Sequence, residues 1–246
     1  MDPLFDFTGK VVLVTGGSRG LGYQMVKAFA SRGADIVIAS RKRDACEAVA
    51  DEVRAMGRRA LAVSAHVGKW DACEALIQAA YAEFGRVDIL INNAGMSPAA
   101  PSHEVPEKLF DAVMNLNFKG PFYLAAQIGK RMADSDGGAI INVSSIASLS
   151  AVPGVVPYSG AKAALNAMTV SMSREYAPKV RVNTITAGPF LTDIAEAWAP
   201  EQRETQSVAL GRPGNPDEIV TAALMLASPS SSYTTGTNVL VDGGHR

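Results

Sequence analysis

Two patterns of hydrophobic residues alternate along this chain of 246 residues. Short runs rich in β-branched and other apolar residues are separated by longer segments in which apolar residues recur every three or four positions. The first pattern predicts buried strands and the second predicts amphipathic helices. The predicted strands are Val11–Val14, Ile36–Ala39, Ala60–Val63, Val87–Ile91, Ala139–Val143, Val180–Ile185 and Asn238–Val241.

The order of these elements predicts an α/β fold. Continuously apolar strands separated by helices indicate a parallel sheet covered on both faces, and right-handed crossovers then give a doubly wound sheet. Since no linker, repeat or low-complexity tract divides the chain, we expect one Rossmann-like domain over residues 1–246, with a seven-stranded parallel sheet and helices on both faces. The expected core positions lie on three helices. They are Leu21, Met25 and Phe29 on the first, Ala45, Val49, Val53 and Met56 on the second, and Trp70, Cys73, Ile77, Tyr81 and Phe84 on the third.

Composition and charge narrow the range of partners. Hydrophobic residues at 48% and charged residues at 19% are typical of a soluble globular protein. A formal net charge of −1, with no basic run beyond 41–43, predicts neither a nucleic-acid nor a membrane partner. The N-terminus does not resemble a signal peptide, and no apolar stretch approaches the roughly 18 residues of a membrane span. Cys46 and Cys73 fit no metal-ligand spacing, so we expect no metal and a reduced, cytoplasmic setting.

The first predicted strand runs directly into a glycine-rich turn that precedes a helix. Glycines allow a tight turn and close approach of the backbone to a diphosphate, and the helix N-terminus supplies amide donors and partial positive charge. The spacing Gly16-x3-Gly20-x-Gly22 differs from the general dinucleotide fingerprint, and a purely structural connector is the alternative. The expected cofactor-binding residues of this turn are Gly16, Ser18, Arg19, Gly20, Leu21 and Gly22.

The end of the second predicted strand distinguishes between coenzymes. NAD sites usually carry an acidic side chain there, which binds the ribose 2′-hydroxyl. This chain has Ser40 and Arg41 and no carboxylate. Arg41, together with Arg19 and Ser40, can hold a 2′-phosphate through charge-assisted hydrogen bonds. We therefore favour NADP(H) over NAD(H); the alternative is a solvated basic patch.

Tyr158 and Lys162 stand four residues apart in a segment of helical character. Residues at this spacing lie on one face of a helix, which places an ammonium beside a phenol. A free tyrosine has a pKa of about 10, and a nearby positive charge lowers that pKa toward the range useful for acid–base chemistry. On its own the pair also fits an exposed helix face.

Taken together, the motifs of this chain resemble those of the short-chain dehydrogenase/reductase family, in its branch of about 250 residues. The resemblance covers nearly the whole chain, and the motifs follow in the family's order and spacing. The residues that carry it are Thr15-Gly16-x3-Gly20-x-Gly22, Asn92-Asn93-Ala94-Gly95, Asn117, Ser145, Tyr158-x3-Lys162 and Asp242-Gly243-Gly244.

The resemblance implies a catalytic role for three of these side chains. Tyr158 is expected to give a proton to a carbonyl oxygen during reduction and to accept one from an alcohol during oxidation. Lys162 is expected to lower the pKa of Tyr158 and to bind the nicotinamide ribose. Ser145 is expected to orient the carbonyl and stabilise charge on its oxygen. Ser144 is the competing serine, and the family spacing favours Ser145.

Asn117 is the fourth expected catalytic residue. Pro121 stands four residues later and has no N–H, so the carbonyl of Asn117 loses its intrahelical partner. In the family this carbonyl holds a water that relays protons to the lysine. A kink that serves packing alone is the alternative, and Asn115 is the nearby competing asparagine.

The resemblance also implies coenzyme contacts after four other strands. His66-Val67 stands where the family commonly has Asp-Val; its imidazole can bind or stack on adenine, or simply lie in an exposed loop. Ala187 replaces the proline that the family commonly has before Gly188. Asn92-Asn93-Ala94-Gly95 follow the fourth strand, and for them a structural role is as well supported as contact with the coenzyme. The expected contacts are His66, Val67, Asn93, Ala94, Gly95, Tyr158, Lys162, Gly188, Pro189 and Thr192.

The expected activity is hydride transfer between NADP(H) and a ketone or secondary alcohol. Residues 190–216 are the expected substrate lid, and the apolar segment 147–156 is another wall of the site. The resemblance is closest to reductases of 3-oxoacyl thioesters, sugar acids and small ketones. Alternatives are a 3-oxoacyl thioester reductase specifically, a catalytically silent nucleotide-sensing protein, or a decarboxylating or epimerising enzyme. A homotetramer, or a dimer, is expected through the helices that carry Asn117 and Tyr158.

Overall fold

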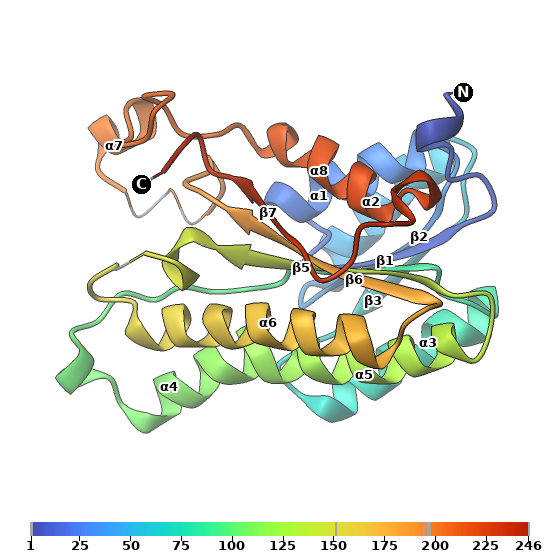
Figure 1. The fold of residues 1–246 in the computed structure, drawn as a ribbon, viewed down its shortest axis with the longest axis horizontal. Coiled ribbons are helices and arrows are strands. Elements are labelled where there is room, and N and C mark those ends of the chain that lie inside the picture. The colour runs from blue at the N-terminus through green and yellow to red at the C-terminus, as the bar shows by residue number, and fades with distance from the viewer. Residues whose placement is uncertain (1, 151, 194, 196–197, 246) are drawn as a thin grey trace.

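The computed structural model describes residues 2–150, 152–193, 195 and 198–245. Its centre is a sheet of seven parallel strands in the order β3-β2-β1-β4-β5-β6-β7 (Figure 1). The strands are β1 Val11–Thr15, β2 Asp35–Ser40, β3 Ala60–Ser64, β4 Ile89–Asn92, β5 Gly138–Ser145, β6 Val180–Ala187 and β7 Asn238–Val241.

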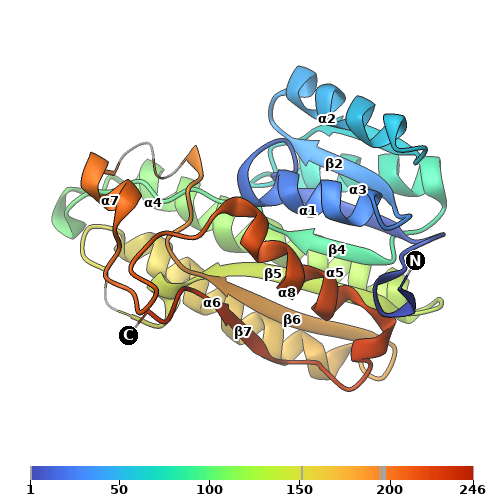
Figure 2. The same cartoon turned by 90° about the horizontal axis from the view of Figure 1, so that it is seen from above.

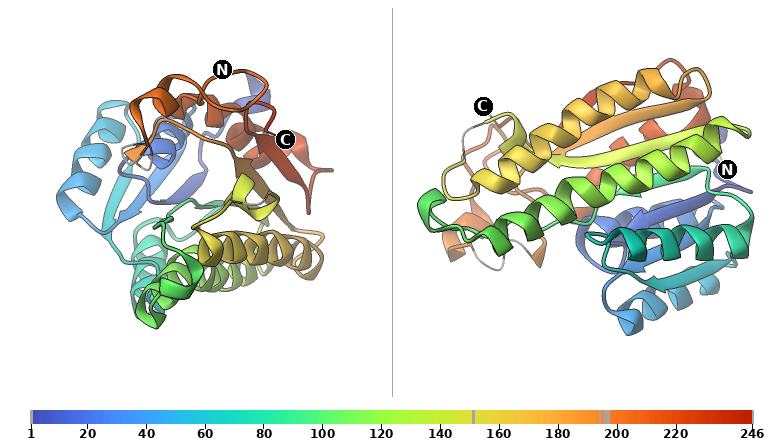
Figure 3. Two further views of the ribbon diagram at one scale, coloured as in Figure 1. Left: turned by 90° about the vertical axis from the view of Figure 1, so that its left-hand side faces the viewer. Right: turned by 90° about the horizontal axis from the view of Figure 1, so that it is seen from below.

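Helices cover both faces of the sheet. Figures 1 and 2 show α1, α2 and α8 on one face, and the view from below in Figure 3 shows α5 and α6 side by side on the other. The short α7 lies at the end of the molecule where the chain leaves β6 (Figure 2). The helices are α1 Gly20–Ala30, α2 Arg43–Ala55, α3 Trp70–Phe84, α4 Glu107–Met114, α5 Gly120–Ala133, α6 Val156–Glu175, α7 Pro200–Glu204 and α8 Val220–Ala227.

Burial on both faces explains why the strands have continuous apolar sequences. Every residue of β1 is buried. Val12 and Val14 belong to the core beneath α1 and α8, while Val11 and Leu13 belong to the core beneath α3, α5 and α6. Successive side chains of a strand point to opposite faces, so each of the two cores takes every second residue.

The structure confirms the predicted fold class and all seven strands, with changes at their ends. β4 begins at Ile89 instead of Val87, and β5 continues to Ser145 instead of ending at Val143. The extension contains polar residues, yet Ser144 and Ser145 still pair with β6. Hydrophobicity marks the buried centre of a strand, whereas backbone pairing with the neighbouring strand fixes its end.

Met56, which follows the last residue of α2 and is 38% exposed, is an error of the predicted core. Trp70 is another. It begins α3 and its side chain is 43% exposed, with Nε1 donating a hydrogen bond to the carbonyl of Lys119 at 3.2 Å. Cys73 and Ile77 of the same helix are buried as predicted. The helical spacing therefore identified the correct face but extended it one turn too far toward the N-terminus.

The strand order creates a switch point beside β1. β1 pairs with both β2 and β4, while the chain leaves β1 toward α1 on one face and reaches α5, after β4, on the other. The segments that follow β1 and β4 therefore separate at the carboxyl ends of the strands, where doubly wound sheets bind their ligands. Within the described residues, none of the helices is long and apolar enough to cross a membrane.

Candidate active site

The backbone of the glycine turn after β1 leaves room for a ligand to approach it closely. Gly16 and Gly20 have positive φ angles of 66° and 54°, a conformation that favours glycine. A Cβ on Gly22 would come within 2.2 Å of the carbonyl oxygen of Gly16, so α1 packs directly on the turn. No side chain caps the N-terminus of α1 at Arg19. Its first amide groups and the helix dipole therefore fit a diphosphate.

The Thr15 hydroxyl and the Asn93 amide join this turn to β4. Thr15 Oγ1 accepts hydrogen bonds from the backbone N–H groups of Asn93 at 3.0 Å and Ala94 at 3.1 Å. Asn93 Nδ2 donates to the carbonyls of Thr15 at 3.0 Å and Gly16 at 3.3 Å. The structural role considered for Asn93 is therefore present, while its contact with a coenzyme ribose stays a prediction. The sequence analysis assigned no role to the Thr15 hydroxyl. A hydroxyl group at the end of an otherwise apolar buried strand could have indicated one.

Ser18 of the glycine turn and Ser40 meet at the end of β2. Ser18 Oγ donates to Ser40 Oγ at 2.9 Å, and the Cys46 thiol lies 3.1 Å from the same oxygen. Arg41 is exposed, and no other described residue forms an ion pair or hydrogen bond with its side chain. Arg19 does not join this group, because its guanidinium forms an ion pair with Asp193 in the lid.

His66 and Val67 lie on opposite sides of the loop after β3. His66 is exposed, and its Nδ1 accepts a hydrogen bond from the N–H of Gly68 at 3.2 Å. Val67 is buried, and its carbonyl accepts a hydrogen bond from the Cys73 thiol at 3.2 Å. The imidazole thus orders its own loop, and contact with adenine stays a prediction.

At the reactive end, β5 and the start of α6 bring Ser145, Tyr158 and Lys162 together. Ser145 is the last residue of β5; its hydroxyl accepts the N–H of Ala147 at 3.2 Å and is hydrogen bonded to the Tyr158 phenol. Lys162, one helical turn after Tyr158, is 4% exposed. Its Nζ donates to the carbonyl of Val143 at 2.8 Å and lies 5.7 Å from the centre of the Tyr158 ring.

Burial controls the protonation of this pair. It raises the pKa of Tyr158, and the hydrogen bond from Ser145 lowers that pKa only in part. It also lowers the pKa of Lys162 to about 8. Both shifts follow because removal from water disfavours a charged group. The expected lowering of the Tyr158 pKa by the lysine ammonium is not found here, since burial is the larger effect and the amine is bonded to Val143.

Asn117 lies in a π-helical turn, Asn115–Lys119, between α4 and α5. Its side chain is fully buried, and Nδ2 donates to the carbonyls of Met96 and Val113, each at 2.9 Å. The N–H of Met96 in turn donates to Asn117 Oδ1 at 3.3 Å. The side chain therefore holds the loop after β4, a role that the sequence did not reveal.

Gly95 places this loop next to the lysine. A Cβ on Gly95 would lie 2.8 Å from Asn117 Oδ1 and 3.6 Å from Lys162 Nζ. Asn117, Gly95 and Lys162 thus lie close together. The widened turn precedes Pro121, which has no N–H to donate, and whether the Asn117 carbonyl is free stays a prediction.

Ser144, the competing serine, has partners other than Tyr158. Its hydroxyl donates to the carbonyl of Lys162 at 3.3 Å, on the helix side of β5. Ser148 supports Ser145 instead, because Ser148 Oγ donates to the Ser145 carbonyl at 2.6 Å and accepts Asn166 Nδ2 at 2.9 Å. Sequence analysis missed Ser148 and Asn166, and nothing in their spacing pointed to them.

The segment after β6 reaches the glycine turn. The Gly188 N–H donates to Val241 at 2.9 Å, and a Cβ on Gly188 would lie 2.5 Å from the Cα of Asp242. The carbonyl of Pro189 accepts the N–H of Gly214 at 2.8 Å, which joins the two ends of the lid. Thr192 packs over Gly20, at 3.3 Å from a Cβ built there. Residues 194, 196 and 197 of the expected lid, and residue 151 of the expected wall, lie outside the described residues.

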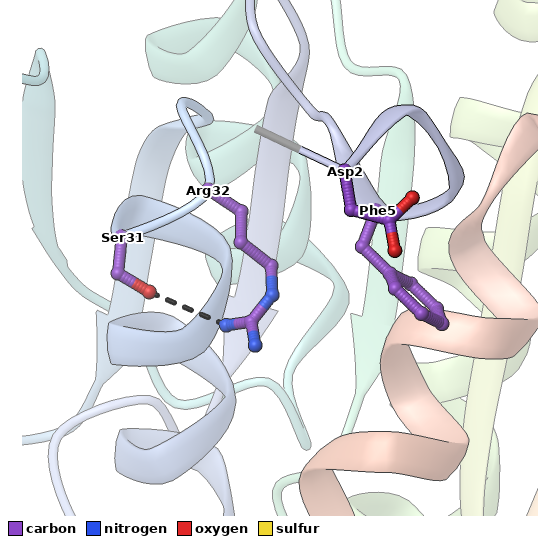
Figure 4. A pocket seen from close by; sticks show the side chains of 4 residues that line it. All are labelled: Asp2, Phe5, Ser31 and Arg32. Atoms are coloured by element: carbon purple, nitrogen blue, oxygen red, sulfur yellow. Dashed lines mark hydrogen bonds between the residues drawn. The ribbon is translucent and has the colours of Figure 1, made fainter.

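Two surface cavities lie away from the reactive residues. One, of about 450 Å³, is lined by Asp2, Phe5, Ser31 and Arg32 at the C-terminal end of α1, opposite the glycine turn (Figure 4). The other, of about 80 Å³, lies between the two ends of the lid and β7. No cluster of metal-ligating side chains is found among the residues that the structure describes.

Comparisons with known proteins agree with this geometry. The short chain dehydrogenase family model matches residues 10–203. The NAD-dependent glycerol dehydrogenase of Listeria innocua is 35% identical, over 99% of this chain and 96% of the relative. This chain belongs to the short-chain dehydrogenase/reductase family. A 3-oxoacyl-(acyl-carrier-protein) reductase of Chlamydia trachomatis is 36% identical, over 96% of each protein.

A solved structure confirms the fold of this short-chain dehydrogenase/reductase. A blue fluorescent protein from a metagenomic library, in complex with NADPH, superposes with a TM-score of 0.92 and 33% identity, over 97% of this chain and 98% of the other. Members of the family bind a nicotinamide coenzyme, and this member is an oxidoreductase. The names of its relatives include both NAD and NADPH, so its coenzyme preference has to be argued from its own residues.

Proposed function

We propose that this short-chain dehydrogenase/reductase transfers hydride between NADP(H) and a ketone or secondary alcohol, with Tyr158 as general acid and base. The observation that carries the proposal is the hydrogen bond between Tyr158 and Ser145, with the buried Lys162 one turn away. These groups lie at the carboxyl end of β5. The glycine turn lies at the carboxyl end of β1, so both are at the same edge of the parallel sheet.

The proposed mechanism assigns the proton to Tyr158. The bound coenzyme supplies or accepts the hydride. Because burial raises the pKa of Tyr158, the phenol is protonated at neutral pH and can donate to the carbonyl oxygen during reduction. Ser145 accepts the N–H of Ala147 with its oxygen, so its hydroxyl hydrogen can turn from the Tyr158 phenol to the carbonyl oxygen of a substrate. Lys162, with its pKa lowered to about 8, still carries a positive charge at neutral pH, and its ammonium is the group proposed to bind the nicotinamide ribose.

NADP(H) is favoured by the residues at the end of β2. Arg41 is exposed beside the bonded pair of Ser18 and Ser40, and the strand ends in Ser40-Arg41-Lys42 without a carboxylate. A charge-assisted hydrogen bond is worth about 1.5–3 kcal/mol. We therefore expect Arg41→Glu to lower kcat/KM for NADPH about tenfold or more and to leave that for NADH nearly unchanged. Equal losses with the two coenzymes would contradict the proposed role of Arg41.

The substrate is proposed as a class only. A 3-oxoacyl thioester is supported by the Chlamydia relative, and a small polyol or ketone by the name of the Listeria relative. The test is a screen of NADPH oxidation with acyl thioesters, sugar acids, diketones and cyclic ketones, repeated with NADH. Product analysis in the same screen detects decarboxylation or epimerisation. Coenzyme binding without turnover of any carbonyl would favour the silent nucleotide-sensing alternative.

We also propose that copies of this chain associate through α4, α5 and α6. Phe110, Phe122 and Val170 on these helices are 46%, 39% and 44% exposed. Helices α5 and α6 lie side by side on one face of the sheet, and α4 packs against α6 (Figure 3). Exposed apolar side chains grouped in this way are typical of association surfaces. A cytoplasmic location and the lack of a nucleic-acid or membrane partner stay predictions from the sequence.

A further inference from the structure

An ion pair joins the substrate lid to the glycine turn. The guanidinium of Arg19 donates to a carboxylate oxygen of Asp193, and these two side chains are 63% and 44% exposed. Thr192, the residue before Asp193, packs over Gly20. The first part of the lid is therefore fastened over the N-terminus of α1, where the coenzyme diphosphate is expected.

This pair holds the Arg19 guanidinium on the lid side of the turn, away from Ser40 at the end of β2. Ser18 contacts Ser40 of that strand. Arg19, the next residue, has an extended backbone with φ −164° and ψ 170°, in which neighbouring side chains point to opposite sides. The side chain of Ser18 consequently faces β2, whereas that of Arg19 faces the lid.

We propose that Asp193 is a determinant of coenzyme preference, because it competes with the 2′-phosphate of NADP(H) for Arg19. The inference rests on the proposed function in that it requires a nicotinamide coenzyme at this turn. A carboxylate and a phosphate are both good partners for the guanidinium fork. A 2′-phosphate has to draw Arg19 from Asp193, and the carboxylate is then left near a second negative group. NAD(H) has a 2′-hydroxyl and leaves the pair intact.

The size of the effect follows from the exposure of the pair. Exposed ion pairs contribute about 0.2–1 kcal/mol, which corresponds to a change of up to about fivefold in an equilibrium constant. Asp193 therefore weakens the preference for NADP(H) by a small factor and does not reverse it. Arg41, which has no competing partner among the described residues, remains the principal contact proposed for the phosphate.

The test measures dissociation constants of NADPH and NADH by nicotinamide fluorescence, without any substrate. We expect Asp193→Asn to raise the ratio of the NADH constant to the NADPH constant about two- to fivefold. The matched control is Glu204→Gln, which removes one negative charge at an exposed position of α7 in the same lid and should leave the ratio unchanged. An unchanged ratio in Asp193→Asn, or an equal rise in the control, would overturn the proposal.

A double-mutant cycle tests whether Asp193 acts through Arg19. In the Arg19→Gln background no guanidinium can be released, so Asp193→Asn should leave the ratio unchanged. A rise of the same size in that background would overturn the competition. Binding of coenzyme without turnover of any carbonyl would contradict the proposed function but not this inference. Failure of the parent protein to bind either coenzyme would remove both.

Discussion

At the scale of single residues, Tyr158 and Lys162 show the same effect of burial on opposite kinds of group. Removal from water favours the neutral phenol and the neutral amine, so the pKa of Tyr158 rises and that of Lys162 falls to about 8. Ser145 offsets part of the first shift through its hydrogen bond. In the proposed mechanism the phenol is therefore the protonated partner at neutral pH, which suits reduction of a carbonyl.

Tyr158→Phe removes this proton while keeping the ring. We expect kcat to fall about 10²- to 10⁴-fold, the usual contribution of a general acid, with coenzyme affinity nearly unchanged. Stopped-flow and steady-state kinetics with a substrate from the carbonyl screen would measure it. Tyr233→Phe is the control, because Tyr233 is fully exposed. Retention of most of the activity in Tyr158→Phe would mean that another group supplies the proton.

The lowered pKa of Lys162 predicts a dependence of stability on pH. Between about pH 8 and pH 10.5 the folded protein has released the lysine proton and the unfolded chain still binds it, so stability attributable to this residue rises with pH. We expect the free energy of unfolding of the parent, relative to Lys162→Met, to rise by up to about 3 kcal/mol across this range. Urea unfolding at several pH values measures it.

The control for this experiment is Lys108→Met, which removes an exposed lysine on α4. It should not reproduce the rise, because Lys108 is not buried. A difference between the parent and Lys162→Met that stays constant over the same pH range would contradict the buried, proton-releasing state assigned to Lys162.

At the scale of the element, glycines determine how closely a helix approaches its neighbours. Gly22 allows α1 to pack on the turn, and Gly120 allows α5 to begin against the loop after β3, where a Cβ would lie 1.8 Å from the carbonyl oxygen of Val67. Gly160 of α6, by contrast, has no atom within 4 Å of the place a Cβ would take. Only the first two are required by packing.

A pair of substitutions separates these two kinds of glycine. Gly22→Ala should destabilise the protein by about 1–3 kcal/mol, because the added methyl has to displace the backbone of Gly16. It should also weaken coenzyme binding, since the turn is then distorted. Gly160→Ala should stabilise the protein by about 0.5–1 kcal/mol, because alanine is the better helix former and its methyl meets open space. Urea unfolding compares the two, and equal effects would contradict the packing described for α1.

At the scale of the whole molecule, the sheet gathers segments that are far apart along the chain. Thr15, Asn93, Ser145 and Gly188 stand at or directly after the ends of β1, β4, β5 and β6. Parallel strands place their carboxyl ends along one edge, so these residues and the N-terminus of α1 surround a common space. The lid closes over the same edge through the contact of Thr192 with Gly20.

The exposed apolar side chains of α5 and α6 predict an oligomer. We expect the parent protein to sediment as a tetramer or dimer, and Phe122→Glu combined with Val170→Glu to shift it to smaller species, because charged groups cannot be buried unpaired in an interface. Analytical ultracentrifugation measures both. The control is Met225→Glu on α8, at the opposite face of the sheet. Sedimentation of the parent as a monomer alone would contradict the proposal.

The sequence by itself determined the order of the elements and the chemistry of the motifs. Burial of every β1 residue leaves a continuous apolar signal, and glycine at a positive φ leaves another, so β1 and the turn at Gly16 could be predicted locally. Tyr158 and Lys162 are one helical turn apart, and that spacing is also visible along the chain.

Only the tertiary structure decided which polar groups meet across elements and how they are protonated. Arg19 binds Asp193, 174 residues later, and Asn117 holds the loop at Met96. The pKa of Tyr158 rises although a lysine follows it one turn later. Such outcomes depend on burial and on contacts between distant segments, because the cost of removing a charge from water is set by all the atoms that surround it and not by its neighbours in sequence.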